Sequence, residues 1–541
     1  MFQQLLTPIG DNLALSFLVA ALPVATVLVL LGVLRRPAWQ AALAGLIVGF
    51  VVAVTAWQMP VDLAADAVAN GAVFALWPVM WIVITALLLY NISVASGRFD
   101  AFRVWVNKHL PNDRRVVLVV IGFCFGALLE GISGFGTPVA ITASLLILCG
   151  FQPLEAIVFV LIFNTAPVAF GALGTPVTVL GAVTSLPAPV LGAMIGRQLP
   201  VLGFILPFYV IAVYGGMRSI KALWPVLLVA GGSFATSQFV ASNFLDYALT
   251  DVLASLGSLI VTILFLQVWK PAPDPEFAIN RDLSAELPAT AKVVAPWQGW
   301  LPWIIVSVTV IAWTDFKVAA IGAHAIKWPG LHNAISITLY GGKAYGAVWN
   351  FQPLATGTAI LLACVVTALL VRLPVGQFFT CIRKTLKQTW IPVITVMLIV
   401  ALAYLMNYSG LAYTLGQGVA STGKAFVILS PFLGWVAVSL SGSDTSGNAL
   451  FGNLQVVAAR QLELSPVLFA ATNSSGGVMG KMISPQNITT GTAVTGLQGR
   501  EGDVFARTFW HSVVLSLVLA LLVIVQQFLI PSIIPALPGA G

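Results

Sequence analysis

Charged residues are scarce in this sequence. Lys, Arg, Asp and Glu make up 8% of the 541 residues, whereas hydrophobic residues make up 59%. Soluble domains carry about 25% charged residues, and the mean hydropathy of +0.99 points the same way. A water-soluble fold could not bury this much apolar surface. The composition therefore predicts an all-α polytopic membrane protein, with the lipid bilayer in contact with most of its surface.

Two further scarcities exclude other classes of protein. The four cysteines, Cys124, Cys149, Cys364 and Cys381, form no CxxC pair, so neither a disulfide framework nor a zinc site is predicted. No basic run with interleaved aromatic residues occurs, and the net charge of +7 fits short orienting loops. We expect no nucleic acid, cofactor or metal. The first apolar stretch, from about Leu13, lacks the flanking charges of a signal peptide and is expected to be a retained span.

Apolar runs recur along the whole chain, and two of them are interrupted. One run is interrupted at Glu130 and resumes at 139–150, and another, at 425–440, turns polar from Ser441. Each is interpreted as a re-entrant hairpin, because non-helical backbone at membrane depth survives only inside protein or beside a wet cavity. The count becomes about 12 transmembrane helices plus two hairpins. The other spans are expected near 12–34, 41–57, 72–95, 154–172, 187–214, 222–240, 252–268, 300–314, 353–371, 390–408, 464–483 and 508–530.

Basic residues set the predicted orientation. They gather after the first and third spans, near Arg218, before the span at 390–408 and before the last span. All of these loops are cytoplasmic if the N-terminus lies outside. The outer loop at 315–350 holds three lysines and fits this orientation least well. Two other outer loops carry pairs of acids, which are Asp62, Asp66, Asp246 and Asp251.

A motif occurs twice with the same spacing. It reads Asn-[Thr/Ser], five residues, Gly, three residues, [Thr/Ser]-Pro, and it begins at Asn164 and again at Asn473. On the predicted orientation the spans 72–95 and 390–408 run in opposite directions, so the two copies are inverted, as is typical of secondary transporters. The chain then divides into N-terminal scaffold spans (1–71), a first repeat with hairpin (72–186), scaffold spans (187–389) with a cytoplasmic linker (270–298), a second repeat with hairpin (390–490) and a C-terminal span (491–541).

The two breaks carry groups expected at a ligand site. A helix that starts inside the membrane directs unpaired N–H groups and a positive dipole end at the break, which favours an anion. Glycines allow close approach, and hydroxyl and amide groups suit a small hydroxylated carboxylate. The predicted substrate-binding residues are Ser133, Gly134, Gly136, Asn164, Thr165, Ser443, Thr445, Ser446, Asn473, Ser474 and Ser475.

Glu130 and Asp444 are the two acids at the breaks. An ionised group at membrane depth is costly and indicates function, so both are predicted proton sites, and Asp444 could equally help to bind a cation. The alternative is a structural cap on a hairpin helix. Lys481 is grouped with them, because it could pair with an acid or with the substrate, or extend to the interface. Glu155 is expected at a helix start, and His511 at the interface rather than in a proton relay.

At these motifs the chain resembles the lactate permease family. The resemblance implies a bacterial inner-membrane symporter that takes up L-lactate, D-lactate and glycolate with a proton. A co-transported proton would cancel the charge of the anion, whose entry against an inside-negative potential costs about 2.3 kcal/mol per 100 mV. The family often has Ala where this chain has Ile132 and Ser133. The matching segments are Glu130–Pro138, Asn164–Gly171, Gly442–Ser446, Asn448–Asn453 and Asn473–Gln486, the last being long and specific.

Three other functions share parts of this pattern. A sodium-coupled carrier of di- or tricarboxylates would use similar hairpins, but it is expected to show more cationic or polar groups. An intramembrane serine protease would use the Gly131-Ile-Ser-Gly134 segment, but it needs a His base within reach, and His511 is the one plausible candidate in an apolar run. Two closed hairpins argue against an open channel. The sequence therefore predicts a transporter and not an enzyme.

Overall fold

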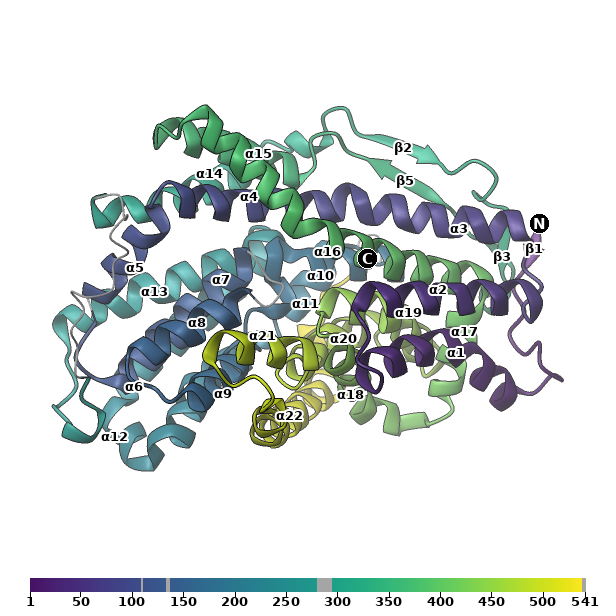
Figure 1. Ribbon diagram of the computed structural model, residues 1–541. Helices are drawn as coiled ribbons and strands as arrows, with labels where there is room; N and C mark the ends of the chain where they lie inside the picture. The colour runs from purple at the N-terminus through teal and green to yellow at the C-terminus, as the bar shows by residue number, and fades with distance from the viewer. Residues whose placement is uncertain (109, 133–136, 280–293, 538–541) are drawn as a thin grey trace.

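The structure, a computed structural model, describes residues 1–108, 110–132, 137–279 and 294–537 and is mostly helical (Figure 1). The first part of the chain forms α1 (Leu13–Gly32), α2 (Ala38–Thr55), α3 (Val61–Phe74), η1 (Ala75–Met80), α4 (Trp81–Ala95), α5 (Arg98–Lys108), α6 (Arg114–Val117), η2 (Leu118–Phe125), α7 (Gly126–Ile132), α8 (Thr137–Leu148), α9 (Pro153–Phe163), η3 (Val168–Phe170), α10 (Gly171–Thr184), α11 (Ala188–Ile195), α12 (Leu199–Phe244), η4 (Tyr247–Leu249) and α13 (Thr250–Val268).

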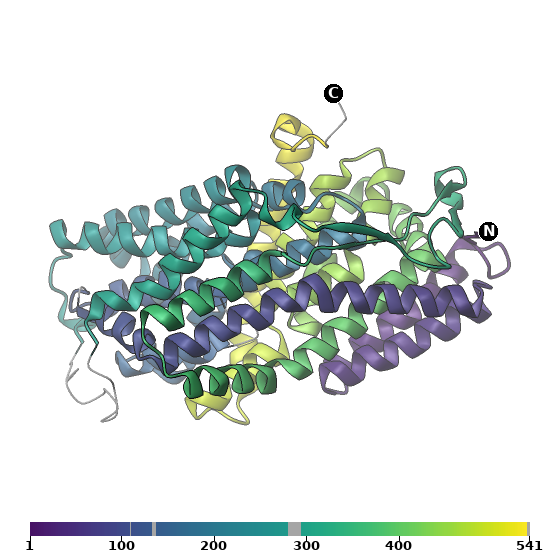
Figure 2. The ribbon, with the colours of Figure 1, turned by 90° about the horizontal axis from the view of Figure 1, so that it is seen from above.

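The second part follows the linker. Its helices are η7 (Pro296–Trp300), α14 (Leu301–Asp315), α15 (Thr356–Leu370), α16 (Val375–Ser409), α17 (Leu411–Ala420), α18 (Phe426–Ser441), α19 (Asp444–Gln461), α20 (Pro466–Lys481), α21 (Pro485–Thr495) and α22 (Glu501–Ile524). Figures 1 and 2 show that α22 lies across the direction of the long helices α3, α4 and α16. Short strands are β1 (Phe2–Gln3), β2 (His324–Lys327), β3 (Ile335–Ile337), β4 (Lys343–Ala344) and β5 (Val348–Phe351).

Apolar helices of membrane-spanning length dominate the fold. Within the described ranges, nine helices are long and apolar enough to cross a membrane, or up to ten with the bent pair α9 and η3–α10. Their outward faces expose large apolar side chains such as Leu18, Leu264 and Leu521, which a protein in water would cover. The chain is therefore a multi-pass α-helical membrane protein. The helix α15 is shorter than a full span, and the count of about 12 crossings stays a prediction.

Both predicted interruptions form antiparallel helical hairpins. Hairpin 1 consists of α6, η2 and α7 with α8, because a Cβ built on Gly126 would lie 3.5 Å from the side chain of Thr142. Hairpin 2 consists of α18 and α19, where the Ser430 hydroxyl donates to Gln455 across the two helices at 2.7 Å. The turn of hairpin 2 is at Gly442, whose φ of +72° favours glycine. How deeply the hairpins lie in the membrane stays a prediction.

Each hairpin packs on a helix of the other repeat. The second limb of hairpin 2 lies on α10, since a Cβ on Gly452 would meet the Leu180 side chain at 2.6 Å. The second limb of hairpin 1 lies on α21, where a Cβ on Gly491 would lie 3.4 Å from Val139. The packing is reciprocal, and the division into inverted repeats stays a prediction.

The expected span 154–172 is wrong as a continuous helix. α9 ends at Phe163, and the chain bends by 66° before it continues through η3 and α10. Three consecutive residues at this break have positive φ, namely Ala172, Leu173 and Gly174. The two non-glycine residues cost about 1–2 kcal/mol each in this conformation, which is typical of functional sites. The second copy differs, because α20 continues past Asn473 and breaks only after Lys481.

Two long helices run antiparallel beside each other. The amide of Asn91, near the end of α4, donates to Thr385 near the start of α16 at 2.8 Å. A Cβ on Gly71 of α3 would meet Ala401, late in α16, at 2.8 Å. The α3–α4 and α16 segments therefore run in opposite directions, the relation expected for 72–95 and 390–408. α12 also turns back on itself at Gly216, whose φ is +67°.

The N-terminus and the loop between α14 and α15 lie together. β1 pairs with β3 in parallel, which places Phe2 opposite Ile335, and β2 pairs with β5. The indole of Trp328 donates to Asp66 at 3.4 Å, so the start of α3 lies at the same end (Figure 1). The expectation that Asp62 and Asp66 lie in a loop is wrong, because both are in the first turns of α3. The strands in the segment 315–350 had no signal in the hydropathy pattern, but their position beside the N-terminus fits the predicted outer side.

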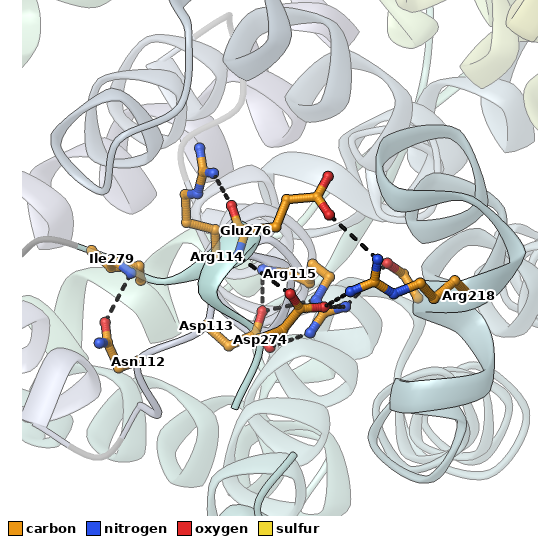
Figure 3. A network of polar contacts seen from close by, with 9 residues as sticks. Asn112, Asp113, Arg114, Arg115, Arg218, Asp274, Glu276 and Ile279 are labelled. Carbon is orange, nitrogen blue, oxygen red and sulfur yellow. Dashed lines mark hydrogen bonds and ion pairs between the residues drawn. The ribbon is translucent and has the colours of Figure 1, made fainter. Parts of the chain in front are cut away.

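A network of ion pairs ties the start of the linker to hairpin 1 and α12 (Figure 3). Arg115 is 1% exposed and pairs with Asp113 at 2.7 Å and with Asp274 at 3.3 Å. Arg218, beside the bend of α12, pairs with the same Asp274 at 2.9 Å. Arg115 also lies over the Phe277 ring, 4.2 Å from its centroid. These basic residues lie near one another, as a shared cytoplasmic side requires.

We expect Arg115→Met to lower the stability of the purified protein strongly. The substitution leaves the Asp113 and Asp274 carboxylates without their buried partner, and breaking a buried pair costs about 3–5 kcal/mol. Thermal unfolding in detergent measures the loss. The matched control is Arg500→Met, because Arg500 and Asp503 form an ion pair with both side chains more than half exposed and such pairs contribute about 0–1 kcal/mol. Equal melting temperatures for the two variants would contradict the prediction.

Candidate functional site

A small cavity lies where the hairpins and the broken helices meet. Its volume is about 50 Å³. It is bounded by the end of α7 in hairpin 1, the break between α9 and α10, the tip of hairpin 2, the end of α20 and the start of α21. We call it the central cavity. Its described lining consists of Glu130, Val168, Gly171, Ala172, Thr175, Pro176, Gly442, Ser443, Asp444, Thr445, Lys481 and Gln486.

An ion pair crosses the cavity between the two repeats. The Lys481 ammonium lies 2.6 Å from Oε1 of Glu130, and both side chains are less than a tenth exposed. The Asn164 amide donates to the other oxygen of Glu130 at 2.9 Å, and its own Oδ1 has no partner among the described residues. Of the three readings open for Lys481, the structure shows the pairing with an acid. Lys481 is also the one cation in the described lining.

Asp444 occupies the first turn of α19 at the tip of hairpin 2. Its Oδ2 accepts hydrogen bonds from Ser474 at 2.5 Å and from Asn448 at 3.2 Å. Its Oδ1 has no hydrogen-bond partner within the described ranges. The carboxyl group is only 3% exposed, so one of its oxygens is free to accept a proton or a ligand hydroxyl.

A buried amide network supports Asp444 from behind. The Asn473 amide donates to Oδ1 of Asn448 at 3.0 Å, and Gln455 donates to Oδ1 of Asn473 at 3.1 Å. All three amides are fully buried. The Asn448 amide also donates to the carbonyl of Pro176 at 3.2 Å, which connects hairpin 2 to α10. Satisfied buried networks of this kind hold side chains in one geometry.

The predicted site residues divide into four groups. Glu130, Ser443, Asp444, Thr445 and Lys481 line the central cavity. Asn164, Asn473 and Ser474 lie one or two hydrogen bonds behind it. Thr165, Ser475 and Ser446 point elsewhere: Thr165 bonds the Ile162 carbonyl, Ser475 bonds Gln198, and Ser446 lines a neighbouring cavity. Ser133, Gly134 and Gly136 lie outside the residues that the structure describes.

Several residues of the site had no separate prediction. Gln486, at the start of α21, and Thr175, at the break, line the central cavity. Asn448 and the buried Asn487, whose amide donates to the Gly442 carbonyl at 3.2 Å, hold the tip of hairpin 2. Gln486 and Asn448 lie inside segments that carry the family resemblance. A search for buried amides next to helix breaks would have found Asn487.

The expectation that Asp251 lies in an outer loop is wrong. Asp251 is in the first turn of α13, fully buried, and a Cβ on Gly131 would lie 2.8 Å from its Cβ. Hydropathy assigned this acid to the loop because the apolar run of the expected span 252–268 begins one residue after it. The packing of α13 on hairpin 1 instead places Asp251 beside Glu130.

A second cavity adjoins the first. It is lined by the end of α1, the start of α2, α16 from Ile391 to Ile399 and Ser446. Ser443 and Gln486 line both cavities. The loop between α1 and α2 carries Arg35, which the basic-residue rule assigns to the cytoplasm. The central cavity therefore adjoins the predicted cytoplasmic side through these two polar side chains.

The remaining ionisable candidates lie away from the central cavity. His511 lies 2.6 Å from the Tyr209 hydroxyl through its Nδ1 and is not among the described residues that line the central cavity. Glu155 is in the first turn of α9, as expected. Arg460 is exposed and lies over the ring of Tyr340, 5.1 Å from its centroid.

Comparison with known proteins covers nearly the whole chain. A family model described as L-lactate permease matches residues 16–530. The L-lactate permease of Salmonella typhi is 40% identical, covering 99% of this chain and 100% of that protein. The glycolate permease GlcA of Escherichia coli (strain K12) is 39% identical, covering 97% and 98%. Among solved structures, the YdaH transporter of Alcanivorax borkumensis matches with a TM-score of 0.42 at 17% identity, covering 85% and 86%, which is too distant to carry an argument.

Proposed function

Since this chain belongs to the L-lactate permease family, we propose that it carries L-lactate, D-lactate and glycolate into the cell together with a proton. It is a transporter of the bacterial plasma membrane and not an enzyme. The observation that carries the substrate class is the central cavity with one described cation, Lys481, and several hydroxyl and amide groups around it. One cation matches one carboxylate, and the polar groups match one hydroxyl.

The substrate would bind by exchange of partners at Lys481. In the structure the ammonium is paired with Glu130. A substrate carboxylate that takes Lys481 leaves Glu130 buried without a cation, which is costly unless Glu130 takes up a proton. Binding one anion and binding one proton are then linked at a single pair of residues. The substrate hydroxyl would donate to the free Oδ1 of Asp444, and Asn164 would hold Glu130 in place.

The hairpins would give access from opposite sides. Hairpin 2 borders both the central cavity and the second cavity, so its tip at Ser443, beside Gln486 of α21, would open the site to the cytoplasm. Hairpin 1 would take the corresponding role toward the outside, because the two copies are inverted. Re-entrant hairpins that close alternately would expose the central cavity to one side at a time.

The test of this function is counterflow of labelled lactate in proteoliposomes over a range of pH and sodium concentrations. We expect exchange of lactate and glycolate without sodium, and accumulation driven by an imposed pH gradient. Active protein that does not exchange lactate would reject the substrate. Accumulation that requires sodium and ignores pH would favour the sodium-coupled di- or tricarboxylate carrier, whose second carboxylate has no cation in the described lining of the cavity.

Asp444→Asn should weaken binding of hydroxy acids more than it weakens coupling to protons. The amide of the variant has the size of the carboxyl group and still fits beside Ser474, but it no longer offers a charged acceptor to the substrate hydroxyl. Hydrogen bonds to charged groups contribute about 1.5–3 kcal/mol. We expect the KM for lactate to rise about tenfold or more, with a smaller change for propionate, which lacks the hydroxyl. Retained lactate exchange with lost pH-driven accumulation would instead assign the proton to Asp444.

A further inference from the structure

A third buried acid lies next to the ion pair of the central cavity. Asp251 is fully buried in the first turn of α13, and neither of its carboxyl oxygens has a hydrogen-bond partner among the described residues. α13 packs closely on α7, because a Cβ on Gly131 would lie 2.8 Å from Cβ of Asp251 and 3.2 Å from the backbone nitrogen of Val252. Gly131 directly follows Glu130 in the chain, and Asp251 interacts electrostatically with Glu130.

The ionisable groups around Asp251 are few in the described ranges. Glu130 of α7 and Lys481 of α20 interact with it electrostatically. Tyr247 of η4 is bonded to Thr178 of α10, and Cys124 of η2 is bonded to Ser258, two turns further along α13. Asp251 thus faces one carboxylate, that of Glu130, and one ammonium group, that of Lys481. The charges of these two groups already cancel each other.

The charges of these three groups balance only if one proton is present. An ionised carboxyl group buried without hydrogen bonds costs several kcal/mol, so Asp251 is stable here when it carries a proton. The set of Glu130, Lys481 and Asp251 is then neutral. When a substrate anion takes Lys481, the set stays neutral only if one further proton enters and Glu130 becomes protonated as well.

We propose that Asp251 is the proton-relay residue of the transporter, a site that passes the coupled proton to Glu130. This inference rests on the proposed proton symport. The proton on Asp251 moves to the Glu130 carboxylate as Lys481 turns to the substrate, and a proton from the outside restores Asp251. On the cytoplasmic side Glu130 releases its proton when the substrate leaves, and it pairs with Lys481 again. One proton enters for each anion, and no charge remains in the buried set.

The test compares Asp251→Asn with wild type in two transport assays. Asn has the shape of the neutral acid but cannot exchange a proton. We expect lactate counterflow to continue, because the loaded protein can return with Glu130 protonated. With an imposed gradient of one pH unit, a one-proton symporter accumulates its substrate about tenfold at equilibrium; Asp251→Asn should accumulate none, and lactate-dependent proton uptake, followed by a pH dye inside the liposomes, should be lost. Asp62→Asn, an exposed acid in the first turn of α3, is the matched control and should behave as wild type.

The other outcomes for Asp251→Asn contradict the proposal. Tenfold accumulation in Asp251→Asn would show that the proton bypasses this residue. Loss of both counterflow and accumulation, in a variant that elutes as folded protein, would assign Asp251 a structural role. The infrared spectra of the substrate-free wild type and of Asp251→Asn give an independent measurement. The band of a protonated carboxyl group should be present in wild type and missing in Asp251→Asn, and an unchanged band would overturn the proposal. Absence of lactate exchange in wild type would instead reject the proposed substrate, and the infrared result would still decide the role of Asp251.

Discussion

Lys481→Met should abolish lactate uptake in proteoliposomes and in cells. Two losses combine in this variant. The substrate carboxylate loses the one cation in the described lining of the central cavity, and Glu130 loses its buried partner at 2.6 Å. Breaking a buried ion pair costs about 3–5 kcal/mol, and a loss of about 2.7 kcal/mol in binding already corresponds to a hundredfold. We therefore expect a decrease of at least about a hundredfold in the initial rate of uptake.

A double variant separates the two losses. Glu130→Gln combined with Lys481→Met removes both charges, so the stability lost in Lys481→Met should return while transport stays absent. Lys424→Met, at an exposed position in the loop before α18, is the matched control and should keep full uptake. Normal uptake by Lys481→Met would remove this lysine from the substrate site. Recovery of transport in the double variant would show that Lys481 serves only to neutralise Glu130.

Gly476→Ala should prevent hairpin 2 from docking on α20. A Cβ at this position would lie 2.1 Å from the carbonyl oxygen of Pro431 and 2.7 Å from its Cα, both in the backbone of α18. Backbone atoms cannot move aside as a side chain can, so the helices must separate, and overpacking of this kind costs about 1–3 kcal/mol or more. Because Asn473 and Ser474 lie on the same helix, the separation also displaces the network that holds Asp444.

The control for this prediction is Gly376→Ala in α16. A Cβ there would meet nothing within 4 Å, and Ala favours a helix over Gly by about 1 kcal/mol. We expect a melting temperature several degrees below wild type, and little transport, for Gly476→Ala, against an equal or higher melting temperature for Gly376→Ala. Equal stability of the two variants would mean that α18 and α20 are further apart than the structure has them.

Local properties of the chain were readable in advance. The two hairpins were predicted because a polar break in an apolar run is tolerated at membrane depth only inside protein or beside a wet cavity. Glu130 and Asp444 were singled out because a charge in such a segment is costly wherever the chain folds, and the structure places both at the central cavity. These arguments depend only on neighbours in the sequence, so they do not require knowledge of which helices meet.

Contacts between distant segments were not readable. Gln486 follows a helix break, but nothing in the sequence marked it as a site residue. It lines the central cavity because α21 starts beside that cavity. Asp251 was assigned to an outer loop, because the hydropathy of α13 begins one residue after it. The continuous span expected at 154–172 is bent at Asn164, although its residues are as apolar as those of an unbroken helix. Hydropathy measures burial along one segment and does not report the surface on which that segment packs.

The sequence by itself determined that this protein is a membrane protein. It also determined that two apolar runs are interrupted, that one motif occurs twice, and that acids lie at the breaks. The motif follows from residue spacing, and the other features follow from the cost of polar groups in lipid, which is a property of single segments. Only the tertiary structure decided that Lys481 pairs with Glu130, 351 residues away, and that Asp251 stands beside them. Pairing across such a distance in the sequence depends on how whole helices pack, and the packing energy depends on both contacting surfaces.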